Sequence, residues 1–289
     1  MKCVGQPFLT VIVPVMNDVS TLGQQLEALA GQAHDGTWEV VVADNGSTDG
    51  SPQLAAAWQD KLPALRVIDA SGCRGAGATR NAAARAARGD VFAFCDADDI
   101  VQPGWVEAYA TAGEQHDLAA GAIFHFSDYR VVTPFRRQPS TEASVVLDFL
   151  PFADSANLMV GRAAFEVVGG FAEDLDRSGD VDLSWRLQLA GHKLHFEPAA
   201  IVAKREKAHL YALWRQEVAW GAADVELYLR FRDHGLPRSS PLTTVRSKLR
   251  RVSSQPELAR FGNRRRWFAH LAHEWGRVKR SARRRVLYL

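Results

Sequence analysis

Apolar runs alternate with amphipathic segments over the first hundred residues. Four short runs are rich in valine, isoleucine and phenylalanine, which is typical of buried strands in a parallel sheet. The segments between them have helical spacing, as in Leu22, Leu26 and Leu29, which share one face. This alternation predicts a parallel, right-handed α/β sheet. The expected strands are 9–15, 38–43, 65–68 and 91–95, and the expected helices are 20–30, one that opens at Ser51–Pro52, and 76–88.

The pattern beyond residue 100 is less regular. Residues 133–144 are polar, contain two prolines and are expected to form a loop. A domain boundary is expected near His234–Pro237, where the helical pattern ends. The expected helices are 105–113, 162–168, 180–190 and 210–231, and the expected strands are 118–129, 194–196 and 200–203.

Three of the four residues that follow the run 91–95 are acidic: Asp96, Asp98 and Asp99. Ligands of parallel α/β sheets gather at the carboxyl ends of the strands. Neighbouring carboxylates repel each other unless a cation or strong hydrogen-bond donors compensate their charge. A hard divalent cation with a phosphate partner accounts for this cluster, and a polar turn at the end of a strand is the simpler alternative.

The net charge of +2 conceals a basic tail. Residues 237–289 hold 15 Lys or Arg and only 2 acidic residues, so residues 1–236 carry a net charge of −11. Within this tail, Trp267, Leu271, Trp275 and Val278 fall on one face of a predicted helix, and basic residues cover much of the rest. Residues 257–289 therefore suit the surface of an anionic membrane. Alternatively, the apolar face packs on the rest of the chain; binding to nucleic acid is not expected.

The cysteines and the apolar runs indicate the cellular compartment of the protein. Cys3, Cys73 and Cys95 lack the spacing of metal ligands and are expected to be reduced packing residues. No run approaches the roughly 20 apolar residues of a membrane span, and the run 8–16 is too short for a secretory leader. We expect a cytoplasmic protein whose basic tail allows association with the inner face of the membrane.

Polar clusters follow three of the predicted strands and begin one helix. The strand ends are Pro14–Asn17, Asp44–Ser47 and Asp96–Asp99, and we expect them to form one rim with the glycine-rich helix start Gly75–Asn81. The N-terminus of a helix favours an anion. The glycines at this helix start also let the backbone approach a ligand closely. Arg80 can add a bidentate phosphate contact. The spacing is not that of the dinucleotide-binding fingerprint.

In their order along the chain, these pieces resemble the family 2 glycosyltransferases of the GT-A fold. The resemblance covers about residues 8–230 and implies a mixed, mostly parallel sheet flanked by helices. It implies a GT-A domain over 1–235, with a nucleotide-sugar-binding half at about 8–110 and an acceptor-binding half at 111–235. A basic helical extension over 236–289 follows. The matching segments are Val11–Asn17, Val41–Gly50, Arg80–Asn81, Gly89–Asp90, Asp96–Asp99, Asn157–Met159, Gly169–Phe171 and Asp180–Arg186.

The resemblance implies transfer of a sugar, with inversion, from a UDP-, GDP- or dTDP-sugar to an acceptor hydroxyl. The setting would be the synthesis of a polysaccharide, glycolipid or glycoconjugate. Nothing in 133–144 or 148–157, where the family places acceptor contacts, identifies the acceptor. The chain lacks the Gln-x-x-Arg-Trp element of processive members. We therefore expect a non-processive, metal-dependent enzyme. The alternatives are an inactive glycosyltransferase-like binding protein and a metal-dependent nucleotidyltransferase.

The family pattern also implies roles for the donor-binding residues. Asp44 would accept a hydrogen bond from the nucleobase; the alternative is a turn residue at a strand end. Arg80 would lie near the nucleotide; the alternative is an ordinary ion pair on a helix. The remaining carried-over positions are Pro14, Val15 and Asn17 beside the nucleobase, Asp96 at the ribose and sugar, and Asp98, together with Asp96, as ligand of Mg²⁺ or Mn²⁺.

Asp180 is carried over as the general base that deprotonates the acceptor hydroxyl. Family members usually have Glu-Asp where this chain has Gly179–Asp180, so no glutamate is carried over. The alternative is that Asp180, like Asp182, only favours the N-terminus of a helix.

The metal site departs from the family pattern at one position. Many members have a histidine after a strand that follows a Pro-x-Ala element, whereas the corresponding stretch here, 198–203, ends at Lys204. An ammonium group cannot ligate a metal, so we expect Lys204 to contact the diphosphate instead. His209 is the candidate substitute ligand, and a structural or solvated histidine is the alternative.

Overall fold

The computed structural model describes residues 9–62, 64–126, 139–206, 209–238, 264–286 and 288. The chain divides into two compact units. The first contains residues 1–144, 150–174 and 179–206, and the second contains 145–149, 175–178 and 207–289. The end of the expected strand 118–129, the first half of the expected loop 133–144, Cys3, and residues 239–263, 287 and 289 of the basic tail lie outside the described residues.

In the described part of the first unit, eight strands form one sheet with the order β3-β2-β1-β4-β9-β6-β10-β5. The pairs β1–β2, β1–β4, β2–β3 and β6–β10 are parallel, and β9 and β5 are antiparallel to their neighbours. The expected mixed, mostly parallel sheet is confirmed. The strands are β1 Leu9–Val15, β2 Trp38–Asp44, β3 Arg66–Asp69, β4 Val91–Phe94, β5 Ile100–Val101, β6 Leu118–Phe126, β9 Leu158–Gly161 and β10 His195–Arg205; β7 Ser144–Val145 and β8 Pro151–Phe152 are short additional strands.

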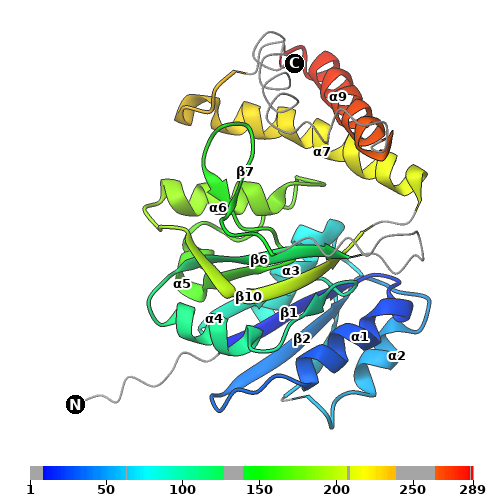
Figure 1. Cartoon of the computed structure of the whole chain (residues 1–289), viewed down its shortest axis with the longest axis vertical. Coiled ribbons are helices and arrows are strands. Elements are labelled where there is room, and N and C mark those ends of the chain that lie inside the picture. The colour runs from blue at the N-terminus through cyan, green and yellow to red at the C-terminus, as the bar shows by residue number, and fades with distance from the viewer. Residues whose placement is uncertain are drawn as a thin grey trace. The chain divides into compact units, whose positions relative to one another are not determined.

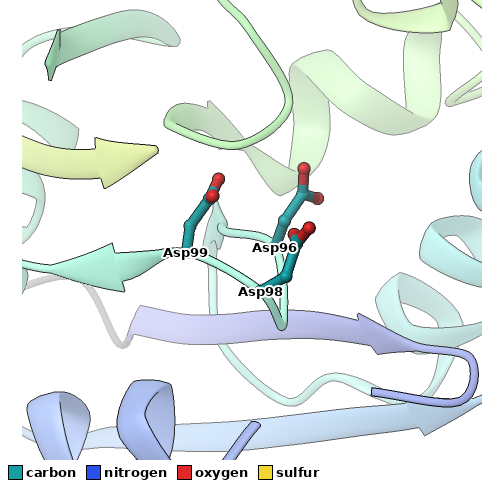
Figure 2. Close-up of side chains that lie close together, drawn as sticks. All are labelled: Asp96, Asp98 and Asp99. Carbon is teal, nitrogen blue, oxygen red and sulfur yellow. The ribbon is translucent and has the colours of Figure 1, made fainter. Parts of the chain in front are cut away.

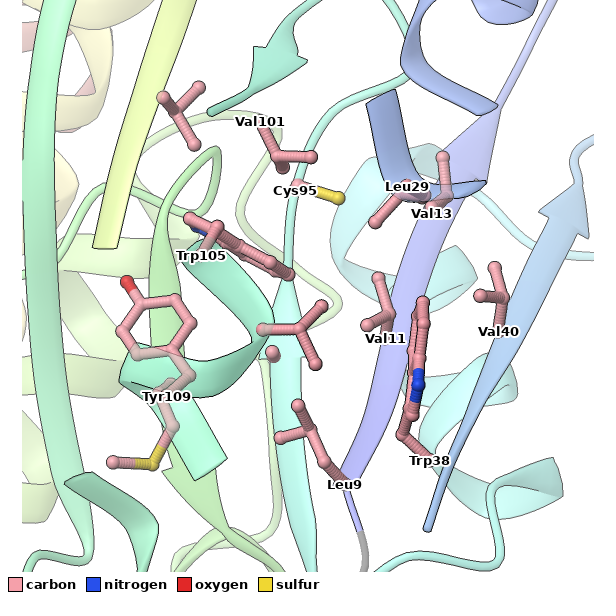
Figure 3. Close-up of a cluster of buried hydrophobic side chains, with 14 of the residues drawn as sticks. Leu9, Val11, Val13, Leu29, Trp38, Val40, Cys95, Val101, Trp105 and Tyr109 are labelled. Atoms are coloured by element: carbon pink, nitrogen blue, oxygen red, sulfur yellow. The ribbon is translucent and has the colours of Figure 1, made fainter. Parts of the chain in front are cut away.

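Helices cover both faces of this sheet (Figure 1). On one face, Leu22, Leu26 and Leu29 belong to the same buried cluster as Val11 and Val13 of β1; Figure 3 shows Leu29 next to Val13. The other face buries the alternate residues of the strands, such as Ile12 and Val41, as the side-chain period of two requires. The first face carries α1 Val19–Ala30, α2 Ser51–Ala56 and α4 Trp105–Gly113, and the second carries α3 Gly75–Ala86, α5 Arg162–Val167 and α6 Gly179–Leu189.

The C-terminal strand of the sheet differs from its prediction. The sequence predicts two strands, 194–196 and 200–203, but β10 is one strand, His195–Arg205, paired with β6 along its length. The register shifts between Glu197 and Ile201. Pro198 lies in this interval and has no N–H for the ladder, so the strand continues around it as a bulge. This continuity carries Lys204 to the carboxyl end of the sheet.

A buried asparagine, Asn157, joins α4, β6 and β10. The side-chain Oδ1 of Asn157 accepts hydrogen bonds from Trp105 Nε1 and Tyr109 Oη, both at 2.7 Å. Its Nδ2 donates to the carbonyl oxygens of Ala122 and Ala200 at 2.9 and 2.8 Å. The amide is fully satisfied, which is what a polar side chain in a core requires. Trp105 is therefore a core residue, with no exposed surface.

The second unit is built around α7 Leu210–Phe231, followed by the 3₁₀ turn η1 Arg232–His234, and α9 Arg264–Arg284. The two helices lie side by side in Figure 1. A Cβ atom added at Gly221 would lie 1.9 Å from the carbonyl oxygen of His273, and one at Gly276 would lie 2.1 Å from that of Val218. The glycines therefore let the two helix backbones touch. Across the described residues, no helix combines the length and the apolar character needed to cross a bilayer.

The contact between α7 and α9 is expected to weaken at alkaline pH. Nε2 of His273 lies 2.9 Å from Oδ2 of Asp224, and Nδ1 lies 3.4 Å from Oε2 of Glu217. Burial alone would lower the pKa of His273, but the two carboxylates raise it from 6.5 to about 9. Because the folded-state pKa is the higher one, this stabilisation is complete below the unfolded pKa and is lost as the pH rises through about 9. We expect a loss of about 1–3 kcal/mol.

Thermal unfolding of the full chain, followed by circular dichroism from about pH 6 to about pH 10, measures this effect. His273→Gln is expected to flatten the pH dependence in this window. His192→Gln, which removes a histidine paired with the exposed Asp117, serves as the matched control. Equal pH dependence in the parent and in His273→Gln would contradict the assignment.

Candidate active site

The acidic residues that follow β4 form a cluster. Oxygens from Asp96, Asp98 and Asp99 all lie within 4.8 Å of one another, and among the described residues only these three form a group that could hold a metal ion. Figure 2 shows the three carboxylates on one loop, pointing to the same side of it. The loop connects β4 in the sheet centre to β5, which pairs with Val202 and Ala203 of β10. The cluster therefore lies beside the C-terminal end of β10.

Asp99 is the most buried member of this cluster, at 1% exposure. Its Oδ1 accepts a hydrogen bond of 2.8 Å from the backbone N–H of Arg205, while its buried Oδ2 accepts none from the residues the structure describes. Burial, and then the charges of Asp96 and Asp98, raise the pKa of Asp99 well above its ordinary value. A buried carboxylate oxygen without a donor fits a hard cation such as Mg²⁺ or Mn²⁺. The sequence prediction assigned Asp96 and Asp98 as ligands but left out Asp99.

Arg80 lies beside the cluster on α3. Its guanidinium donates a hydrogen bond of 2.5 Å to Oδ1 of Asp96, and only 8% of its side chain is exposed. Its Nε is buried and has no acceptor among the described residues. The alternative role of Arg80, an ion pair, is thus present. The Arg80 side chain of this pair is buried, however, and the pair lies at the acidic loop. A nucleotide contact by Arg80 stays a prediction.

Lys204 forms an ion pair with Asp154. Its Nζ donates a hydrogen bond of 2.5 Å to Oδ2 of Asp154, and the backbone N–H of Ala156 donates to Oδ1 at 3.0 Å. Burial would raise the pKa of Asp154, but the charge and hydrogen bond of Lys204 hold it below its ordinary value. The pKa of Lys204 is raised against the effect of burial by Asp154, and then by Asp96 and Asp99. Lys204 therefore connects the acidic loop with Asp154.

Asp180 belongs to the first turn of α6, where Oδ1 accepts a hydrogen bond of 2.9 Å from the N–H of Val181. Its Oδ2 accepts one of 3.1 Å from the N–H of Ser155. Burial, and then the charge of Asp154, raise the pKa of Asp180. A raised pKa makes a carboxylate a stronger proton acceptor, which suits a general base.

Asp182, two residues further along α6, has a structural role. It is fully buried, and its Oδ2 accepts a hydrogen bond of 2.8 Å from Nε of Arg186. Arg186 also donates to the carbonyl oxygens of Val168 and Gly170. Asp182 thus holds α6 to the preceding glycine turn.

The carboxyl ends of β1 and β2 form the neighbouring part of the rim. Val15 is paired with Asp44 at the last positions of the two strands. The backbone N–H of Ser47 donates to Oδ2 of Asp44 at 3.2 Å, and Thr48 N–H donates to Oδ1 of Asn17 at 2.8 Å. Asp44 therefore shapes the turn, which is the role of a turn residue at a strand end that was the alternative for it. The proposed nucleobase contacts of Pro14, Val15, Asn17 and Asp44 stay predictions.

Sequence reasoning overlooked Asp154 and left His209 undecided. Asp154 lies in the segment 148–157, but only the fold brings it to Lys204, fifty residues later. No local motif signals this pair. His209 caps the N-terminus of α7 in the second unit and is not part of the acidic cluster. Its role as a metal ligand stays a prediction.

Relatives of known class share this sequence pattern. The chain is 29% identical over 241 residues to the pre-mycofactocin glycosyltransferase of Mycobacterium tuberculosis (strain CDC 1551 / Oshkosh), covering 79% of this chain and 49% of that protein. It is also 29% identical over 196 residues to the glycosyltransferase AglE of Haloferax volcanii, covering 66% of this chain and 64% of that protein. The chain thus spans about half to two thirds of the length of these curated relatives.

Solved structures share the fold. The mannosyltransferase PcManGT of Pyrobaculum calidifontis, in complex with GDP-Man and Mn²⁺, superposes with a TM-score of 0.65 at 17% identity, covering 96% of this chain and 88% of that one. S. aureus TarS 1–349, in complex with UDP-GlcNAc, superposes with a TM-score of 0.54 at 21% identity, covering 73% of this chain and 66% of that one. These likenesses confirm the predicted GT-A fold.

The family profile described as "Glycosyl transferase family 2" matches residues 10–169, which is more than half of the chain. This span includes β1, β2 and the acidic loop after β4. The sequence match and the fold lead to the same assignment: the chain belongs to glycosyl transferase family 2.

Proposed function

We propose that this protein transfers a sugar from a nucleotide-diphospho-sugar to an acceptor hydroxyl, with inversion at the sugar carbon. The observation that carries the proposal is the continuous cluster from the acidic loop through Lys204 and Asp154 to Asp180. One end of it suits a diphosphate with a cation, and the other suits an acceptor hydroxyl. UDP-GlcNAc and GDP-Man in two proteins of the same fold support a nucleotide-sugar donor.

The donor would lie along the rim formed by β1, β2 and the acidic loop. Asp44 would accept from the nucleobase, next to the backbone of Pro14 and Val15, and Asp96 would face the ribose and sugar. Asp98, together with Asp96 and Asp99, would hold Mg²⁺ or Mn²⁺. When bound, such a cation stabilises the negative charge that develops on the leaving diphosphate.

Lys204 would supply positive charge to the same diphosphate. The half-buried ammonium group is held by Asp154, so it needs little reorganisation when the leaving group acquires charge. Lys204 would thus neutralise part of the negative charge of the diphosphate, at the position where many family members have a histidine. Arg80, with its buried Nε, provides a further donor on the same side.

The reaction itself would be a single displacement. The acceptor oxygen attacks the anomeric carbon, the bond from that carbon to the diphosphate oxygen breaks, and the diphosphate leaves with the electron pair. Asp180 takes the proton of the acceptor hydroxyl. Because the acceptor attacks from the face opposite the leaving group, the configuration at the sugar carbon inverts.

The setting proposed for this reaction is the cytoplasmic side of a membrane, in polysaccharide, glycolipid or glycoconjugate synthesis. The thiols of Cys73 and Cys95 are free, which suits a reducing compartment. Transfer of one sugar per encounter is proposed, since the chain lacks the element of processive members.

A thermal-shift panel of UDP-, GDP- and dTDP-sugars, with and without Mn²⁺, tests the donor class. The matching donor at about 100 times its Kd is expected to stabilise the first unit by about 2.7 kcal/mol, and to do so more strongly with Mn²⁺.

Chromatography of the same mixtures is expected to detect slow release of the nucleoside diphosphate. Release of pyrophosphate from a nucleoside triphosphate would point to a nucleotidyltransferase instead. Stabilisation without any turnover would point to a binding protein.

A further inference from the structure

One face of α9 presents large apolar side chains to solvent. Trp267, Leu271, Trp275 and Val278 are 60%, 60%, 54% and 44% exposed. Their spacings of four, four and three residues place them in one row along the helix. We call these four residues the docking stripe. A continuous apolar row of this kind on a helix marks an interaction site.

The docking stripe is not the face that packs on α7. That face uses other residues: Ala272 is fully buried, Gly276 touches the backbone at Val218, His273 is held by Asp224, and the ring of Phe268 lies 5.1 Å from that of Trp214. The four residues of the docking stripe are therefore spared from the packing of the second unit. Their substitution should leave the α7–α9 contact intact.

Cations lie beside the docking stripe. The sequence of α9 contains eight Arg or Lys and one Glu. Lys279 follows Val278 directly and, with Arg283, lines a groove of about 290 Å³ between α7 and α9. Arg215 adds a further cationic side chain to this groove, whereas Arg280, which also lines it, is paired with Glu226 at 3.4 Å.

We propose that α9 docks the protein on an anionic lipid surface. The docking stripe would enter the boundary between headgroups and acyl chains, where tryptophan rings are favoured. The cationic groove beside it would hold lipid phosphates. A helix of 21 residues lying flat extends for about 30 Å, so all four apolar residues can enter the surface together.

The charge of the helix favours lipid over a protein partner. The central part of a protein interface is depleted in charged residues, whereas here the apolar row is narrow and the helix that carries it has eight Arg or Lys among its 21 residues. A narrow apolar row with a basic flank is the pattern of helices that lie in an anionic membrane interface.

Flotation of the full chain with lipid vesicles tests the proposal. We expect the protein to bind vesicles of phosphatidylcholine with about one third phosphatidylglycerol, and to bind pure phosphatidylcholine at least about tenfold more weakly. The triple variant Trp267→Ser, Leu271→Ser, Trp275→Ser should bind the anionic vesicles about tenfold more weakly or worse. Lys279→Glu with Arg283→Glu should lose the preference for anionic vesicles.

The matched control is Leu210→Ser with Tyr211→Ser, which removes two exposed apolar side chains at the start of α7 in the same unit. This variant should bind like the parent chain. Circular dichroism and thermal unfolding establish that each variant is folded. No binding to either vesicle, equal binding to both, or unchanged binding of the triple variant would overturn the proposal. A parent chain that is dimeric without lipid, and a triple variant that is monomeric, would assign the stripe to a second copy instead.

Discussion

Replacing Asp180 with asparagine is expected to lower the rate of sugar transfer by about a thousandfold or more. The amide keeps the size of the carboxylate but cannot accept the proton of the acceptor hydroxyl. Its carbonyl oxygen can still accept the hydrogen bond from Ser155, so the local structure should persist. Donor binding should change by less than about twofold, because Asp180 lies at the end of the cluster that is assigned to the acceptor and not to the diphosphate. Product formation by chromatography and donor affinity by calorimetry measure the two effects separately.

The pH profile gives a second measurement of the same role. Burial and Asp154 raise the pKa of Asp180, and only the ionised carboxylate can act as a base. The value of kcat/KM should therefore fall as the pH is lowered through this raised pKa, at a higher pH than an ordinary carboxyl would give. Glu166→Gln on the exposed surface of α5 is the matched control and should behave like the parent. Transfer at the parental rate by the asparagine variant would refute the role of Asp180.

Replacing Asp98 with asparagine is expected to weaken Mn²⁺-dependent donor binding by about a hundredfold. Asp98 supplies one of the three oxygens that lie within 4.8 Å of one another, and a neutral amide is a poorer ligand for a hard cation. Repulsion within the loop should decrease at the same time, so the pKa of Asp99 should fall toward its ordinary value. The variant should therefore be at least as stable as the parent without metal, although it binds the donor less well.

Calorimetric titration of the donor with Mn²⁺, with Mg²⁺ and with a chelator measures this loss. Asp60→Asn, an acid-to-amide change at an exposed position, is the matched control. The difference between parent and Asp98→Asn should disappear in chelator. Tight donor binding and full activity of the parent in chelator would favour Lys204 as the main source of positive charge.

The local pattern was sufficient for most of the first unit. The continuous apolar runs of β1 and β2 and the leucines of α1 mark elements that the core buries, and burial is what determines these positions. The acidic loop could be located as well, because a buried strand followed by carboxylates places them at the carboxyl edge of the sheet. The order of the motifs along the chain then indicated the family and the fold.

The tertiary structure decided which distant groups meet. The pair of Asp154 with Lys204, and the hydrogen bond from Ser155 to Asp180, join segments with no shared local pattern. The first of these pairs depends on how β10 passes its bulge at Pro198 and reaches the acidic loop. Neither composition nor spacing contains that information.

The tail illustrates the same division. The periodicity of bulky apolar residues correctly predicted an amphipathic helix in α9, but it could not tell which face packs on α7. The close contact belongs to Gly221 and Gly276, because only residues without a side chain let two helix backbones touch. The sequence by itself thus determined the elements, the family and the position of the acidic loop. The partners of Asp99, Asp180 and Lys204, and the exposure of Trp267 and its neighbours, depend on contacts between distant segments that exist only in the folded chain.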